Sequence, residues 1–184
     1  MIYREKMIED AQKWEKNLFA NSIRVLEAEY GKAQRRSEVV QIFTELFRQW
    51  EINTRQKAAS LGICYLHHNI LMKTGKLRLT LYGTELYLDE NQIENEWDLP
   101  FFFEKYEQDM AVLTDRIRAD YPRVYAYEVD AIRYHYAEYY YAAIAGMCRD
   151  MLEEIKDSKE YHQLNKTEDF CFFFGRWRGE AQKL

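Results

Sequence analysis

Residues 129–155 read VDAIRYHYAEYYYAAIAGMCRDMLEEI. On a helical wheel, apolar and aromatic side chains cover more than half of the circumference of this stretch. They are Val129, Tyr136, Tyr140, Tyr141, Ala143, Ile144, Met147, Cys148, Met151 and Ile155. Only a narrow strip with Glu138, Arg149 and Glu153 remains polar. A helix with so wide an apolar arc must be covered on two sides, so we expect it to form the buried centre of the fold.

The size and composition of the chain predict one domain over residues 1–184. A chain of 184 residues, 47% hydrophobic and 31% charged, with 7 Gly and 2 Pro, is typical of a folded globular protein. At this length roughly 70% of the extended-chain surface is buried on folding, which is enough for one hydrophobic core.

Three further segments have helical periodicity. The first, Tyr3 to Tyr30, carries a heptad-like apolar row, which indicates a seam inside the molecule or, as the alternative, homo-oligomerisation through this N-terminal helix. The second begins at Ser37, a good N-cap residue, and is expected to run to about residue 60. The third follows Pro100 and ends near residue 120, before Pro122.

From residue 63 to residue 89 the apolar pattern changes to alternation, which predicts an antiparallel sheet. The turns expected at residues 73–76 and 82–84 divide it into three strands over residues 63–72, 76–82 and 85–89. In this register Leu79 and Leu88 point into a helical layer, while Arg78 and Tyr87 point away from it.

The aromatic segment at residues 170–178 reads FCFFFGRWR and is expected to add a strand to the sheet or to lie across the helices. The predicted fold class is therefore α+β, in the order ααβββαα. Four main helices pack on a small three-stranded antiparallel meander, with the aromatic segment at the C-terminal end.

Charge and hydropathy limit the classes of partner. The net charge of -5, with both signs interspersed, argues against nucleic-acid binding over a large surface, although Arg35, Arg36, Arg176 and Arg178 leave a local basic patch open. No apolar run approaches the ~20 residues of a membrane span, and charged residues follow Met1 closely, so we expect neither a membrane span nor a signal peptide and a cytoplasmic location. Cys64, Cys148 and Cys171 are expected to be reduced core thiols.

No catalytic, metal or cofactor-binding motif is recognisable. His67 and His68 are neighbours on a predicted strand and would point to opposite faces, so they do not form a metal pair. Cys64 lies near a histidine but in apolar sequence, and the carboxylates of Glu85, Asp89, Glu90 and Glu94 have no distinctive spacing. We predict no catalytic residue, metal or cofactor, although a weak case for an enzyme remains.

Two groups of residues are candidates for binding. Trp and Arg are enriched in interface hot spots, which makes Arg176, Trp177 and Arg178 an interface candidate, together with Trp97 and with Tyr139 beside the small Ala142 and Gly146. For each of them the alternative is structural anchoring. A second hypothesis is a ligand pocket between sheet and central helix, lined by His67, His68, Tyr136 and Tyr140.

The favoured function is that of a non-catalytic protein that binds another macromolecule, as an adaptor, an inhibitor or an immunity-type protein. A surplus of Tyr and Trp without catalytic spacing supports this interpretation. The alternatives are a small-ligand sensor or enzyme that uses the His and Tyr pocket, and a nucleic-acid-associated accessory protein that uses the four arginines.

Overall fold

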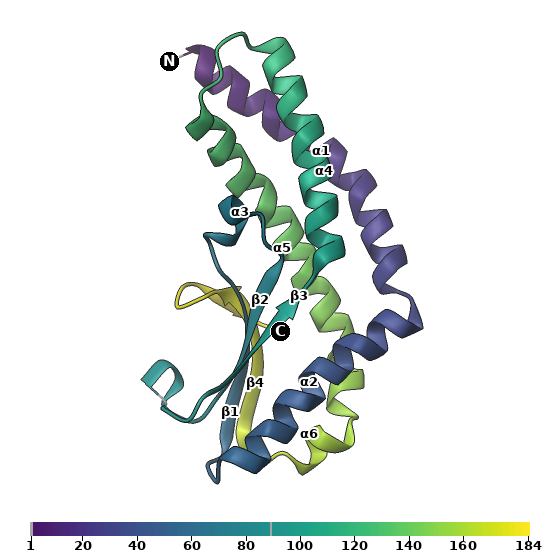
Figure 1. The fold of residues 1–184 in the computed structure, drawn as a ribbon, viewed down its shortest axis with the longest axis vertical. Helices are drawn as coiled ribbons and strands as arrows, with labels where there is room; N and C mark the ends of the chain where they lie inside the picture. The colour runs from purple at the N-terminus through teal and green to yellow at the C-terminus, as the bar shows by residue number, and fades with distance from the viewer. Residues whose placement is uncertain (1, 89) are drawn as a thin grey trace.

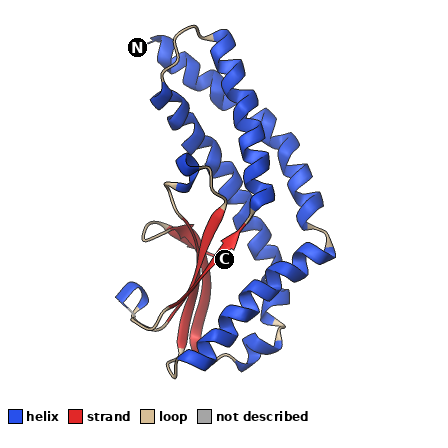
Figure 2. Cartoon of the chain, in the orientation of Figure 1, coloured by secondary structure: helices blue, strands red, loops and turns tan. Residues whose placement is uncertain are grey.

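The computed structural model describes residues 2–88 and 90–184 and has a mixed helix and strand architecture (Figures 1 and 2). The elements in chain order are α1 (Ile2–Tyr30), α2 (Ala33–Asn53), β1 (Ala58–Tyr65), α3 (Asn69–Met72), β2 (Lys76–Tyr82), the 3-10 turn η1 (Leu86–Leu88), β3 (Ile93–Asp98), α4 (Pro100–Asp120), α5 (Ala126–Lys156), α6 (Lys159–Gln163), β4 (Lys166–Arg176) and β5 (Ala181–Lys183). Within these residues the strands form a five-stranded sheet in the order β3-β2-β1-β4-β5. The predicted α+β class is confirmed.

The long helix α5 connects the two parts of the molecule. Its N-terminal half packs with α1 and α4 in a helical bundle, and its C-terminal half lies with α2 and α6 against one face of the sheet (Figure 1). The carboxylate of Glu128 accepts a hydrogen bond of 3.0 Å from the backbone N–H of Tyr125, which closes the first turn of the helix. The prediction of a buried central helix over residues 129–155 is confirmed, because α5 contains this stretch.

The other long helices differ from expectation mainly at their ends. In α1 the heptad-like row is buried at Met7 and Ala11, which are 1% and 0% exposed, whereas Val25 of the same row is 47% exposed. Homo-oligomerisation through this helix stays a prediction. α2 begins at Ala33, ahead of the expected cap Ser37, and stops at Asn53. It stops there because the indole of Trp50 donates to the carbonyl of Gln56 at 3.1 Å and turns the chain back, so Ala58 already starts a strand.

The predicted three-stranded meander is wrong. Residues 63–72 are divided between the end of β1 and the short helix α3, and the expected strand at 85–89 is replaced by the η1 turn, with Asp89 outside the described residues. The third strand is β3, and β4 lies between β1 and β5. β1 and β4 are parallel whereas the other neighbours are antiparallel, so the sheet is mixed. The aromatic segment therefore does add a strand, but inside the sheet.

The face of β2 is as predicted, but that of residue 88 is not. Leu79 is 0% exposed against the helical layer, and Arg78 lies on the opposite face. Leu88 is 81% exposed, because it belongs to a turn and not to a strand. The alternation of apolar and polar residues over 85–89 resembles a strand only by chance. Residues 86–88 form a turn that is not paired with a strand, so their side chains do not follow the faces of the sheet.

The face of the sheet opposite to the helices carries its own aromatic layer. A Cβ atom built on Gly62 would lie 2.5 Å from the Phe173 ring, which shows that this ring packs directly on the glycine backbone. Tyr82 stacks on Phe173, with ring centroids 6.1 Å apart, and meets Tyr87 edge to face at 5.5 Å. Gly62 is therefore required by close approach, and the aromatic side chains take the place of a second helical layer.

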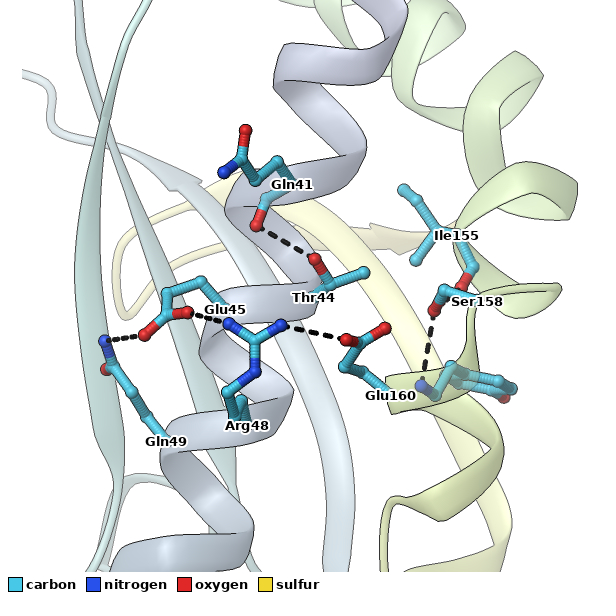
Figure 3. Close-up of polar contacts among 9 residues, drawn as sticks. Gln41, Thr44, Glu45, Arg48, Gln49, Ile155, Ser158 and Glu160 are labelled. Carbon is cyan, nitrogen blue, oxygen red and sulfur yellow. Dashed lines mark hydrogen bonds and ion pairs between the residues drawn. The ribbon is translucent and has the colours of Figure 1, made fainter.

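Polar contacts hold the short helix α6 against α2 (Figure 3). The guanidinium of Arg48 bridges Glu45, at 2.5 Å, and Glu160, at 2.8 Å. The hydroxyl of Ser158 accepts a hydrogen bond of 3.2 Å from the backbone N–H of Tyr161 and so caps α6. These contacts fix the chain where it leaves α5 and enters β4.

Candidate functional site

Trp177 follows the end of β4 and lies on the aromatic face of the sheet. Its backbone N–H donates to the carbonyl of Tyr65 at 3.0 Å, which places the indole directly beyond β1. The Cζ atoms of Arg78 and Arg178 are 4.6 Å and 5.6 Å from a Trp177 ring centroid. The Tyr87 ring meets the indole edge to face at 6.1 Å. Trp177 is half-buried, so part of this assembly faces solvent.

An exposed apolar turn adjoins this tryptophan. Leu86, Tyr87 and Leu88 are 43%, 36% and 81% exposed, and the short helical turn that carries them projects at the lower left of Figure 2, away from the helical layer. Leu86 has a φ of 50°, a left-handed conformation that is strained for a bulky side chain. We call Trp177, Arg78, Arg178, Leu86, Tyr87 and Leu88 together the Trp177 surface.

The charged side chains around the Trp177 surface are of both signs, since Glu85 precedes Leu86 and Glu180 lies in the same depression as Arg176 and Arg178. Arg78 is 3.4 Å from the carboxylate of Glu94. Within the described part of the chain, Arg176 and Arg178 have no ion pair with a carboxylate, and both are exposed. Arg178 also has a left-handed backbone, with a φ of 51°. The surface therefore combines apolar side chains, two aromatic rings and cations that are free to pair with an acidic group.

The other predicted interface residues lie elsewhere. Trp97 is 2% exposed and packs edge to face on Phe43 at 5.7 Å, so it belongs to the core and presents no surface to a partner in this fold. Tyr139 is half-buried and packs on Phe19 of α1 at 5.4 Å. Of the five interface candidates, only Arg176, Trp177 and Arg178 lie together at the surface.

The structure does not bring His67, His68, Tyr136 and Tyr140 into one pocket. His67 and His68 are exposed in the turn before α3, not on a strand, and the His67 ring stacks on Tyr134 at 4.2 Å. Tyr136 and Tyr140 are 0% and 4% exposed and lie inside the helical bundle. The two tyrosines and the two histidines are thus in separate environments.

A buried carboxylate that sequence reasoning missed organises the helical bundle. Asp109 of α4 is 1% exposed, and its Oδ2 atom accepts hydrogen bonds from the hydroxyls of Ser22, Tyr136 and Tyr140 at 2.5, 2.7 and 2.6 Å. The Lys105 ammonium is 2.7 Å from Oδ1. The signal was present in the sequence, since Asp109 lies on the apolar face of α4 between Tyr106 and Leu113.

A second buried carboxylate lies further along the bundle. Glu15 of α1 is 1% exposed, and its Oε2 atom is 2.6 Å from Nδ1 of His135, whereas its Oε1 atom has no hydrogen-bond partner among the residues that the structure describes. Burial raises the pKa of Glu15, and the nearby His135 opposes this shift. Asp109 joins α4 to α1 and α5, and Glu15 joins α1 to α5, so both carboxylates hold the bundle together and lie away from the Trp177 surface.

Cys64 and Cys148 are buried thiols, whereas Cys171 is half-buried. Burial raises the pKa of the Cys64 thiol to about 12, which keeps it protonated near neutral pH. Burial also raises the pKa of Cys148. Among residues 2–88 and 90–184, no group of three or more His, Cys, Asp or Glu side chains is arranged to hold a metal ion.

Comparison with protein-family models, with curated proteins and with solved structures finds no match for this chain. In the described residues, no helix is both long and apolar enough to cross a membrane. The function must therefore be argued from the site itself.

Proposed function

We propose that this protein acts by binding another protein through the Trp177 surface, in the manner of an adaptor, an inhibitor or an immunity-type protein. The observation that carries the proposal is that the exposed, strained turn Leu86–Leu88 adjoins a tryptophan that two guanidinium groups approach. A cytoplasmic location and the absence of catalysis are parts of this proposal.

The energetics of exposed apolar groups support it. Three consecutive exposed apolar side chains lower solubility, and the left-handed backbone of the first of them, Leu86, adds strain; such segments are rare unless they serve an interaction. Trp, Tyr and Arg dominate binding hot spots because they bury a large area and retain polar contacts. The free guanidinium of Arg178 favours a partner with an acidic side chain near its apolar contact, which adds association rate and selectivity.

Leu88→Asp is the sharpest test, because residue 88 is 81% exposed and the substitution removes no internal packing. The matched control is Ile52→Asp, at a residue that is 75% exposed near the end of α2. Each variant and the wild type is used for affinity capture from the native host, and each captured protein is then purified and titrated. We expect to find a partner that binds the wild type and Ile52→Asp with the same affinity. Its affinity for Leu88→Asp should be about 30-fold lower, equivalent to about 2 kcal/mol.

Two further variants make the test independent of a single residue. Trp177→Ala and Arg178→Ala should each weaken the binding of the same partner. The arginine variant should change mainly the association rate and its dependence on salt. Thermal melts recorded in parallel separate lost binding from lost folding. If every captured protein binds the folded Leu88→Asp and Trp177→Ala variants as well as it binds the wild type, the Trp177 surface is not the interface.

A further inference from the structure

A cavity of about 360 Å³ lies where the corner between α1 and α2, at the right of Figure 1, faces α5. This volume is at the lower end of the range for small-molecule sites. Among the lining side chains, the rings of Tyr30 and Phe102 pack together with centroids 4.6 Å apart. The cavity lies between helices, whereas the Trp177 surface is on the opposite face of the sheet, so the two are separate.

Gly146 forms part of the wall and has no packing reason to be glycine. A Cβ atom built on it would meet no atom within 4 Å outside the local helix. Glycine in a helix interior is less favourable than alanine, because it loses more backbone freedom on folding. Gly62 contrasts with it, because there a Cβ atom would collide with a ring. The effect of glycine at residue 146 is therefore to leave space in the cavity.

The charges at the cavity favour a cation. Glu27 and Asp150 both line it, and within the part of the chain that the structure describes neither carboxylate has an ion pair or a hydrogen bond. Arg36 is the lining cation. Its guanidinium pairs with the carboxylate of Glu154, which accepts from Nε at 2.9 Å, and donates to the backbone carbonyl of Asp150 at 3.3 Å, so the Asp150 carboxylate itself is not paired. α1 ends and α2 begins at this corner, so the opposite partial charges of the two helix ends offset each other and the carboxylates decide the sign of the charge.

We propose that this cavity binds a small organic ammonium ion with an apolar body. The apolar body would lie in the space beside Gly146 and against Tyr30 and Phe102, which line the cavity. The ammonium group would pair with Glu27 and Asp150, which the protein leaves unpaired. This proposal does not depend on the Trp177 surface and adds a ligand site to a partner-binding protein.

The probe is 2-phenylethylammonium, and hexylammonium is a second probe of different shape. Neutral 2-phenylethanol and anionic phenylacetate have similar apolar bodies and serve as charge controls. Isothermal titration calorimetry on the full chain at pH 7 should show binding of at least one ammonium probe, at least about tenfold tighter than that of either control. No heat from either ammonium at millimolar concentration, or equal binding of cation, alcohol and anion, would overturn the proposal.

Substitutions then locate the site. Gly146→Leu fills the space that a Cβ atom would enter and should lower the affinity for the ammonium probe at least about tenfold. Asp150→Asn and Glu27→Gln should each lower this affinity about three- to tenfold. Glu153→Gln, at an exposed position of α5, the helix that carries Asp150, should leave the affinity unchanged. If Gly146→Leu melts early, Gly146→Ala, whose methyl group meets open space, keeps the fold and should still weaken binding. Full affinity in a folded Gly146→Leu variant would show that the ligand binds elsewhere.

Discussion

The hydroxyl of Tyr136 donates a hydrogen bond of 2.7 Å to Oδ2 of Asp109, a carboxylate that is 1% exposed at the centre of the helical bundle. Tyr136 belongs to α5 and Asp109 to α4, so this contact joins the two helices. Ser22 extends the connection to α1 through the same oxygen atom. These polar groups are buried and cannot hydrogen-bond to water, so each depends on the others for its hydrogen bonds.

Replacing Asp109 with Leu should therefore destabilise the protein strongly. The substitution leaves three hydroxyls and the Lys105 ammonium without their acceptor, and breaking such a buried network typically costs about 3 to 5 kcal/mol. Asp115→Leu, at an exposed position of the same helix, is the control and should change the free energy of unfolding by less than about 0.5 kcal/mol. Urea denaturation measures both, and similar midpoints for the two variants would contradict a central role for Asp109.

Stability should fall steeply in alkaline solution. Burial, together with the bond to Asp109, raises the pKa of Tyr136 and of Tyr140, and burial raises the pKa of Tyr106. In the unfolded chain these phenols ionise near pH 10, so their stabilising contribution is complete below about pH 10 and is lost as the pH rises further. Each group adds about 1.4 kcal/mol per pH unit to the slope of the free energy of unfolding.

Urea denaturation between pH 8 and 11.5 checks this expectation. Tyr136→Phe should reduce the alkaline slope by the contribution of one group, since phenylalanine has no proton to lose. Unfolding free energies that stay level up to pH 11 in the wild type would show that the buried phenols ionise as readily as in the unfolded chain.

Leu79 and Leu88, which the alternating pattern places on the same face, should respond very differently to substitution. Leu79→Ala removes a side chain that is 0% exposed and should cost about 2 to 5 kcal/mol. Leu88→Ala removes one that is 81% exposed and should cost almost nothing. Chemical denaturation of the two variants side by side is the measurement. An equal loss of unfolding free energy in both would contradict an exposed side chain at residue 88.

The contact between Gly62 and Phe173 should appear as a coupling energy. Gly62→Ala places a methyl group 2.5 Å from the ring and should cost about 1 to 3 kcal/mol. In a Phe173→Ala background the ring is absent, so the same glycine substitution should cost much less. Denaturation of the wild type, both single variants and the double variant gives the coupling, and strictly additive losses would show that the ring does not rest on Gly62.

Sequence periodicity by itself predicted the buried helix α5, the helices α1 and α4, and the inward face of β2. These features follow from local geometry, because a helix or a strand repeats its apolar side chains with its own period wherever it lies in the fold. Hot-spot chemistry also marked Arg176, Trp177 and Arg178 as interface candidates, and a role for them in binding stays a prediction. The alternating pattern placed Arg78 and Tyr87 on the face away from the helices, but no local pattern indicated that both would contact Trp177.

Only the tertiary structure decided the strand order and the sites. The parallel pairing of β1 with β4 brings together segments far apart in the chain, and no short-range pattern specifies which strand pairs with which. The same long-range packing buries Trp97 in the core, converts Asp109 from one of many acidic residues into the acceptor of a buried network, and leaves open space over Gly146. Residue type sets what a side chain can bind, but its neighbours across the fold determine whether it is buried, paired or free.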